Sequence, residues 1–342
     1  MRSTLVTTLI IFLLGAVVLN VYKLLMERGH LDVLNSSIHR DNGHAIVLNG
    51  TWSVSLAEGR THSEYGFVQI PKCTGASFSL DATHHIPQGS YLKSYPGFDL
   101  CASGPPKNAV VFLRHPRHHV YSQFLECKYG DWGKIVTSKS NMTFPRDNME
   151  KVSGGFKEWV THFKTGEKDD YNCYNPINMM TRYLACIRVS QDDKRSTHHS
   201  ATTDYRDLEV AKGKLLEAAF VGISDHYNQS VCAFEYVTSG TTKCECVAGN
   251  LITHSEITLE DHNVPPHSLG EMSDDILRSI DSLTVLDAQL YNHAYESFWL
   301  FVDVASNATG VDLRCGGAHA GDNLRELSFE PFYGPDKPMP FH

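Results

Sequence analysis

The segment Phe67–Phe78, with the sequence FVQIPKCTGASF, predicts a β-strand, a tight turn and the first residues of a helix. Its first four residues have an apolar pattern typical of a strand, and a turn with Pro, Lys and Gly precedes a helix start expected at Ser77. The first backbone N–H groups of a helix have no internal partners and lie at the positive end of the helix dipole. Lys72 adds a positive charge at the loop entrance, while Gly75 and Ala76 leave room for an anion to approach the backbone. We therefore expect an anion-binding turn, with an ordinary strand-to-helix turn as the alternative.

A second strand-to-helix junction follows further along the chain. After a short helix expected over residues 77–83, the segment up to Pro106 is rich in Gly, Pro and Ser and is expected to form a loop. The apolar run Ala109–Leu113 then predicts a buried parallel strand, which ends at Arg114 and is followed by Pro116 at the first turn of another helix. An open α/β sheet binds its ligands at such junctions, outside the carboxyl ends of its strands. The two junctions therefore predict an α/β fold with a parallel sheet and flanking helices, in which two phosphates of one nucleotide would be held.

The composition is that of a globular protein with an acidic balance. The chain has 342 residues, of which 42% are hydrophobic and 20% charged, and its formal net charge is −9. This length suffices for one large domain or two small ones. A general nucleic-acid binder would normally carry a basic excess, so nucleic acid is not an expected partner.

The N-terminus carries an apolar run, Leu5–Val21, flanked by Arg2 and Lys23. A run of about 17 residues is at the short end of what spans a bilayer. A cleaved signal peptide is the alternative, but no clear small-x-small cleavage site follows the run, so we expect an uncleaved signal anchor. The expected organisation is a cytoplasmic tail (residues 1–4), a transmembrane anchor (5–22), a lumenal stem and domain entry (23–64), a main domain (65–330) and a C-terminal tail (331–342).

Glycosylation sequons and cysteines favour a lumenal main domain. Asn-x-Ser/Thr sequons occur at Asn35, Asn49, Asn141, Asn228 and Asn307. If Cys73 stays free in the anion-binding turn, eight of the nine cysteines remain for up to four disulfides, which suits an oxidising compartment. The Cys244-Glu-Cys246 pair is too closely spaced for a usual zinc hairpin, so structural disulfides are expected rather than a metal site.

The two junctions resemble the cofactor motifs of the Golgi carbohydrate sulfotransferases. Residues 71–78 resemble the 5′-phosphosulfate loop of that family. Phe112–Pro116 together with Ser122 resembles its 3′-phosphate motif, in which Arg and Ser stand eight residues apart, as Arg114 and Ser122 do here.

Three further segments follow in the family's order. Asn178–Ala185 resembles the N-x-x-T-R-x-L-A segment of the heparan sulfate 6-O-sulfotransferase branch. Residues 219–224 are similar to its FFGLTE strand, and Leu286–Ala294 is similar to its LDxQLYxYA helix. The resemblance spans residues 67–301 and is closest to the 6-O-sulfotransferase-like branch.

The resemblance implies a P-loop-like sulfotransferase fold and an enzyme that uses 3′-phosphoadenosine 5′-phosphosulfate (PAPS). The reaction would move a sulfuryl group in line to a hydroxyl of a glycan, with the 6-O position of a glycosaminoglycan-like polysaccharide suggested by the branch. The protein would be a single-pass type II glycoprotein of the Golgi membrane with a lumenal catalytic domain. Sulfuryl transfer asks the protein mainly for alignment and for charge stabilisation on the leaving phosphate. No metal is expected, because the histidines show no H-x-x-x-H helical pair with a nearby carboxylate.

The expected site residues follow from the motifs and from their chemistry. Lys72 would stabilise charge on the bridging oxygen, the turn would hold the 5′-phosphate, and Arg114 with Ser122 would hold the 3′-phosphate. A lone Arg in an apolar helix is costly to bury without an anion, so Arg182 is expected to contact cofactor or acceptor. The expected cofactor contacts are Lys72, Cys73, Thr74, Gly75, Ala76, Ser77, Arg114, Ser122 and Arg182.

The base that activates the acceptor is the least defined residue. The family branch uses a His between the two phosphate motifs, and this interval contains His84 and His85. Both are catalytic candidates. The alternative is a pair of histidines at a helix C-terminus, where a positive charge is favourable.

Two departures from the family pattern and two rival functions remain open. His115 stands where the family has Asp and His119 where many members have Arg, which predicts pH-sensitive cofactor binding.

A P-loop nucleotide triphosphatase is disfavoured because Lys72 precedes the glycine of its turn instead of following it. The other rival is a catalytically weak or inactive membrane-anchored glycan-binding protein of the same fold.

Overall fold

The computed structural model describes residues 46–48, 52–54, 64–96, 106, 108–145, 151–165, 171–186, 203–253, 264–265 and 267–315. Contacts divide the chain into two compact units, Met1–Glu58 and Gly59–His342. The expected anchor at residues 5–22 lies outside the described residues. Within the described ranges, no helix is both long and apolar enough to cross a membrane.

The first unit contributes one short antiparallel pair, inside the segment expected to be a stem. Strand β1 (Ile46–Leu48) pairs with β2 (Trp52–Val54), with Ile46 opposite Val54.

The second unit is built on a four-stranded sheet with the strand order β4-β3-β5-β6. The strands are β3 (Glu64–Gln69), β4 (Tyr91–Pro96), β5 (Ala109–Leu113) and β6 (Phe220–Ile223). All three pairings are parallel, with Val68 opposite Val111 and Val111 opposite Val221. Every residue of β5 and β6 is buried, as expected for parallel strands covered on both faces. The prediction of an α/β fold with a parallel sheet and flanking helices is therefore confirmed.

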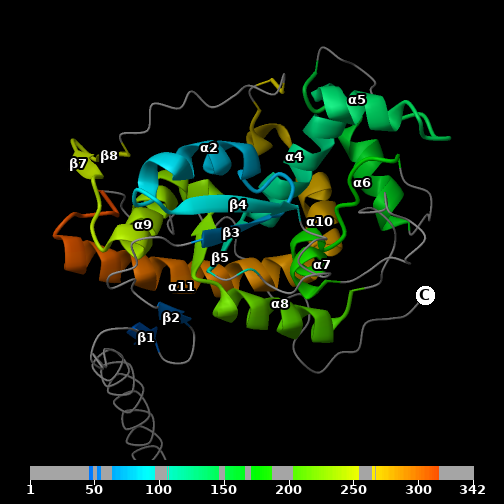
Figure 1. Cartoon of the computed structure of the whole chain (residues 1–342). Helices are drawn as coiled ribbons and strands as arrows, with labels where there is room; N and C mark the ends of the chain where they lie inside the picture. Colours follow the sequence, from blue (N-terminus) through cyan, green and yellow to red (C-terminus); the bar gives the residue numbers. More distant parts are fainter. Residues whose placement is uncertain are drawn as a thin grey trace, which may run out of the picture. The chain divides into compact units, whose positions relative to one another are not determined.

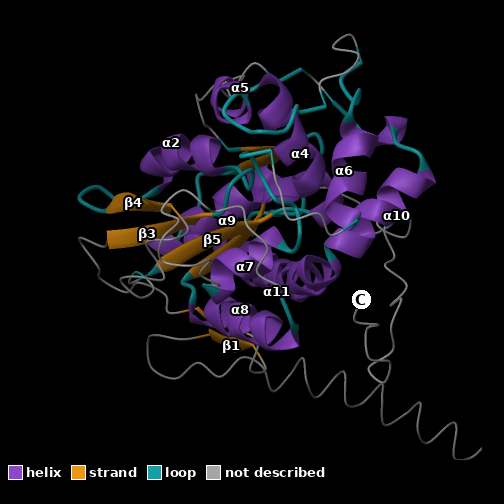
Figure 2. Cartoon of the chain, turned by 90° about the vertical axis from the view of Figure 1, so that its right-hand side faces the viewer, coloured by secondary structure: helices purple, strands orange, loops and turns teal. Residues whose placement is uncertain are grey.

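Helices cover both faces of the sheet (Figures 1 and 2). Helix α2 (Gly75–His85) lies on one face and contacts α9 (Tyr227–Ser239), whereas α8 (Tyr205–Glu217) and α11 (Val285–Thr309) lie on the other. Helix α7 (Met179–Ala185) packs against α8 and α11. Two 3-10 turns, Ser224–His226 and Leu269–Glu271, precede α9 and α10 (Asp274–Leu283).

A second core lies among helices beyond the sheet. It joins α4 (Pro116–Tyr129), α5 (Asp131–Thr137), α6 (Phe156–Lys164) and α10 (Asp274–Leu283). Aromatic side chains dominate it, and Phe124 contacts both Phe156 and Trp159. Arg117 forms a bidentate ion pair with Asp281, in which Nε and Nη2 donate to the two carboxylate oxygens at 2.8 and 2.7 Å. This pair joins α4 to α10. This packing holds α4 rigidly beside the sheet.

Disulfides tie the second unit together. The bonded pairs are Cys127–Cys173, Cys232–Cys244 and Cys246–Cys315. The last two anchor the exposed hairpin of β7 (Glu245–Val247) and β8 (Asn250–Ile252) to α9 and to the end of α11. Disulfide bonding was expected from the sequence, as was a free Cys73, which the structure leaves unbonded and buried.

Two boundaries differ from the sequence-based expectation. Helix α2 begins at Gly75 rather than Ser77, because Thr74 takes a left-handed conformation and turns the chain directly into the helix. Strand β4 lies inside the stretch expected to be a loop. It is an edge strand paired only with β3 in the described sheet and largely exposed, so it lacks the apolar face that would reveal it.

Candidate active site

The two predicted junctions meet at the carboxyl end of the sheet. Strands β3 and β5 are parallel neighbours, and β4 and β6 lie on their outer sides, so the strand order reverses between them. Ligands of open α/β sheets bind outside this switch point. The guanidinium of Arg114 donates to the carbonyl of Lys72 at 3.1 Å, and Nε2 of His119 donates to the carbonyl of Pro71 at 2.8 Å. The loop after β3 is thus held by the residues that follow β5.

The loop has the backbone geometry of a tight cradle. Lys72 and Thr74 both have positive φ, 63° and 58°, in the left-handed region that costs a non-glycine residue about 1 kcal/mol or more. A Cβ on Gly75 would lie 2.5 Å from Nε2 of Gln69, so a larger residue would require the Gln69 side chain to move. The hydroxyl of Thr74 donates back to the carbonyl of Cys73 at 2.7 Å and does not cap α2. The first amides of α2 therefore lack a side-chain cap from Thr74, as an anion-binding helix start requires.

Lys72 has a carboxylate partner that sequence reasoning missed. Its ammonium lies 2.8 Å from Oε2 of Glu126, on the third turn of α4, and both side chains are largely buried. The residue expected to stabilise the leaving group is therefore paired with a carboxylate of the protein itself.

The other predicted cofactor contacts lie around the same loop. Cys73 is buried, and burial raises the pKa of its thiol, so it is a neutral packing residue. Ala76 is exposed and Ser77 is half-buried at the start of α2. Ser122 is 6% exposed on α4, two turns beyond Arg114. Chain position and helix geometry therefore bring the two phosphate motifs together.

The histidines expected to make cofactor binding sensitive to pH are deeply buried. Burial lowers the pKa of His115 to about 3 and that of His119 to about 3. Burial therefore favours the neutral form of both imidazoles, and pH-sensitive cofactor binding stays a prediction.

Arg182 lies in a structural network. Its side chain is 7% exposed and donates to the carbonyls of Ile177 and Asn175 at 2.7 and 2.6 Å. These two carbonyls satisfy the buried guanidinium of Arg182, for which a cofactor or acceptor contact was expected.

Two helix starts beside Arg182 cap each other. The carboxylate of Asp287 accepts from the backbone N–H groups of Met180 and Thr181, while the side-chain oxygen of Asn178 accepts from those of Leu286 and Asp287. Burial raises the pKa of Asp287 to about 6 against the effect of these bonds. The motif segments around residues 178–185 and 286–294 thus join α7 to α11.

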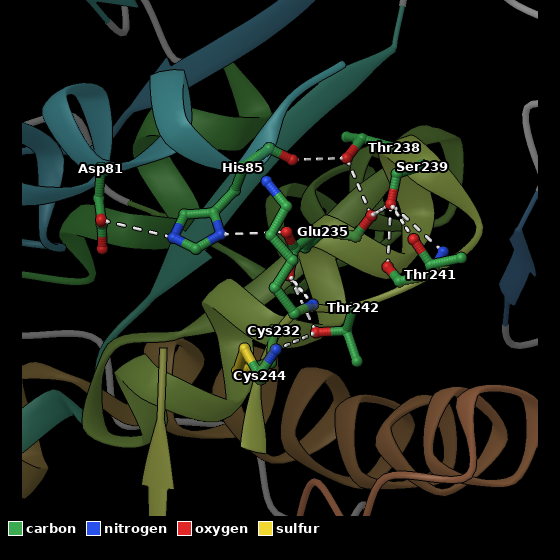
Figure 3. A network of polar contacts seen from close by, with 10 residues as sticks. Asp81, His85, Cys232, Glu235, Thr238, Ser239, Thr241, Thr242 and Cys244 are labelled. Atoms are coloured by element: carbon green, nitrogen blue, oxygen red, sulfur yellow. Dashed lines mark hydrogen bonds and ion pairs between the residues drawn. A yellow bond between two sulfur atoms is a disulfide. The ribbon is translucent and has the colours of Figure 1, made fainter. Parts of the chain in front are cut away.

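The two candidate bases lie at the opposite end of α2 from the loop. Ten residues of helix separate His85 from Gly75, which corresponds to about 15 Å. His85 is buried between Asp81 and Glu235, at 3.6 and 3.7 Å from their carboxylate oxygens (Figure 3). Burial alone would lower the pKa of His85, but the two carboxylates outweigh it and raise the pKa to about 9. His84 is exposed on the last turn. Both histidines therefore lie at the C-terminus of α2, and His85 links α2 to α9 through Glu235.

A different histidine faces the carboxyl end of the sheet. Nδ1 of His118, on the first turn of α4, lies 2.5 Å from Oδ1 of Asp225, which follows β6. The backbone N–H of His115 donates to the other carboxylate oxygen at 2.7 Å. Burial would raise the pKa of Asp225, but the bonds from His118 and His115 lower it to about 2. Asp225 closely follows strand β6, so a search for charged residues at strand ends, which found Arg114, would also have found Asp225. Its contact with His118 depends on the three-dimensional fold and has no signal in the sequence.

No protein-family model matches this chain, and no curated protein matches it.

Proposed function

We propose that this chain is a PAPS-dependent carbohydrate sulfotransferase with the sulfotransferase version of the α/β fold. The observation that carries the proposal is the contact between the loop after β3 and Arg114 after β5, at the switch point of a parallel sheet. Two cationic side chains and an uncapped helix start converge there, as a donor with two separate phosphate groups requires.

Each residue has a chemical role in this proposal. The amides at the start of α2 and the hydroxyls of Thr74 and Ser77 hold the 5′-phosphate. Arg114 and Ser122 hold the 3′-phosphate, and Lys72 stabilises the negative charge that develops on the leaving oxygen. PAPS supplies the activated sulfuryl group, and the acceptor is a glycan hydroxyl.

The compartment and the acceptor class rest on the sequence. The N-terminal apolar run, the sequons and the disulfides support a lumenal Golgi enzyme with a type II anchor, and disulfide formation requires an oxidising compartment. The resemblance of residues 178–185 and 286–294 to the 6-O-sulfotransferase branch supports a glycosaminoglycan-like acceptor.

The test is ligand-induced stabilisation of the full chain, purified in detergent, by 3′-phosphoadenosine 5′-phosphate (PAP). At a hundred times its Kd, PAP should stabilise the fold by about 2.7 kcal/mol, which is roughly 5 °C or more in Tm for a domain of this size. Arg114→Ala should abolish the shift. Arg278→Ala is the matched control, since Arg278 is exposed and pairs with Asp275 on the surface of α10. Absence of a shift in the wild-type protein would contradict the proposal.

A second candidate function has one observation in its favour. The ion pair between Lys72 and Glu126 neutralises the main catalytic cation, as would suit a glycan-binding protein of this fold that has lost catalysis. PAP binding without sulfate transfer to any glycan would favour this candidate.

A further inference from the structure

The contact between His118 and Asp225 has the geometry of an oriented proton acceptor. An ionised carboxylate can only accept a hydrogen bond, so the 2.5 Å contact places a proton on Nδ1 of His118. In the neutral imidazole with this tautomer, the other ring nitrogen, Nε2, carries the lone pair that can accept a proton. The His118 side chain is 42% exposed, whereas that of Asp225 is 19% exposed, so the imidazole is the accessible partner. A carboxylate that fixes the tautomer of a more accessible imidazole is a recurring arrangement for general bases.

Asp225 is held in place beside the loop after β3. It directly follows Ser224, whose hydroxyl lies 3.4 Å from that of Thr74 in the loop. The backbone N–H of His115 and the hydroxyl of Tyr291 also donate to its carboxylate, at 2.7 and 3.5 Å. The dyad of His118 and Asp225 is therefore fixed at the carboxyl ends of β5 and β6, beside the loop after β3.

The dyad lies beside the residues assigned to the donor. Arg114 directly follows β5, and His118 lies on the first turn of α4, the helix that follows. Arg114 also donates to the carbonyl of Lys72 at 3.1 Å. The other charged or titratable groups near the dyad are His115, Tyr291, Arg117 and His226.

Other histidines of the region are less suited to the task. His115 and His119 are buried and closely packed, and His85 is enclosed by two carboxylates at the far end of α2. His267 is exposed, but its Nδ1 lies 2.9 Å from the carbonyl of Pro265 and its ring packs edge-on against Tyr121 at 5.4 Å. A carbonyl also fixes a tautomer, so His267 serves as the experimental comparison.

We propose that His118, positioned by Asp225, is the general base of this enzyme. This inference rests on the proposed sulfotransferase function. The acceptor hydroxyl gives its proton to Nε2 of His118 while its oxygen forms a bond to sulfur. The bond between sulfur and the 5′-phosphate oxygen breaks, and its electron pair remains on that oxygen, where Lys72 stabilises the charge. Asp225 stays ionised and stabilises the imidazolium that forms.

The test compares His118→Gln with His267→Gln in the full chain, using radiolabelled PAPS and a glycan that the wild-type protein sulfates. His118→Gln should lower kcat by about 10²- to 10⁴-fold, the usual contribution of a general base. KM for PAPS and stabilisation by PAP should stay within a few-fold of wild type. His267→Gln should retain kcat within a few-fold. In the wild-type protein kcat should fall at low pH as the base becomes protonated, and this fall should vanish from the residual activity of His118→Gln.

The positioning role of Asp225 is tested with Asp225→Asn, which keeps the shape and removes the charge. Its kcat should fall at least tenfold with KM for PAPS little changed, and the midpoint of the low-pH fall should move. A wild-type protein that fails to bind PAP would overturn the proposed function itself. If the wild-type protein binds PAP and transfers sulfate, an unchanged kcat in His118→Gln overturns the assignment of the base. Loss of PAP stabilisation in His118→Gln also overturns it, because His118 would then belong to the donor site.

Discussion

Lys72, in the loop after β3, and Glu126, on the third turn of α4, form an ion pair of 2.8 Å. Their side chains are 18% and 13% exposed, so solvent screens the contact only in part. A bound phosphate ester would compete with Glu126 for the same ammonium. Binding of the donor and release of Lys72 from Glu126 are therefore expected to be coupled.

Glu126→Gln should tighten PAP binding, because the competing carboxylate is removed. An ion pair of about 1 kcal/mol corresponds to about a fivefold lower Kd. Titration calorimetry measures the change. Asp131→Asn is the control, since it removes the exposed partner of Lys134 on the neighbouring α5 and should leave Kd unchanged. Weaker PAP binding in Glu126→Gln would show that Glu126 helps to position Lys72 instead of competing for it.

Asp287→Ala should destabilise the fold because it uncaps α7. The buried carboxylate accepts from the backbone of Met180 and from both the backbone and the hydroxyl of Thr181. Loss of these acceptors should lower the free energy of unfolding by about 2–4 kcal/mol, measured by urea denaturation. Asp275→Ala, which breaks an exposed pair with Arg278, should change it by less than about 0.5 kcal/mol. Equal effects of the two substitutions would contradict the capping role.

The pH dependence of stability should carry the signature of His85. Its folded pKa of about 9 lies above the ordinary value, so the stabilisation is complete below the ordinary pKa and is lost as pH rises through 9. The free energy of unfolding should therefore fall between about pH 6.5 and 9. His85→Gln should lower stability at pH 6 and flatten this fall. His84→Gln, at the exposed neighbouring position, should leave it unchanged, and the same flattening in both variants would contradict the assignment.

Lys128→Met should loosen the segment that precedes α6. The ammonium of Lys128 is fully buried and donates to the carbonyls of Lys151, Val152 and Gly154 at 2.9, 3.4 and 2.9 Å. Removing the ammonium deletes these three hydrogen bonds from a charged donor, which should lower the free energy of unfolding by about 2–4 kcal/mol. Amide hydrogen exchange should quicken over residues 151–156. Lys139→Met, at an exposed position, should change neither quantity.

The sequence predicted the elements that have a strong local signal. The apolar run Ala109–Leu113 is strand β5 with the expected bounds, and the helix with Pro116 in its first turn is α4. Both signals are local, since a continuous apolar run must be buried and proline fits a helix start. Strand β4 gave no such signal, because its pairing with β3 arises from the backbone and its side chains face solvent.

The candidate site was predicted only in part, because some of its contacts join residues that are distant in the sequence. Lys72 and Arg114 each follow a strand, so a rule about strand ends found them. The partners of the site residues come from distant parts of the chain: Glu126 is 54 residues from Lys72, and His118 is 107 residues from Asp225. Local patterns carry no information about such pairs, whereas the strand order of the sheet brings them together. For the same reason His84 and His85, close to the loop in sequence, lie a helix length away from it.

Transfer of radiolabelled sulfate from PAPS to a panel of neutral and acidic glycans, by the full chain in detergent, tests the central claim most directly. We predict transfer to at least one glycan, reduced by about 10²-fold or more in Lys72→Ala because the leaving oxygen loses its cation. Lys212→Ala, on the surface of α8, is the control and should keep full activity. Binding of PAP without transfer to any glycan would contradict the claim and would leave a glycan-binding protein of this fold.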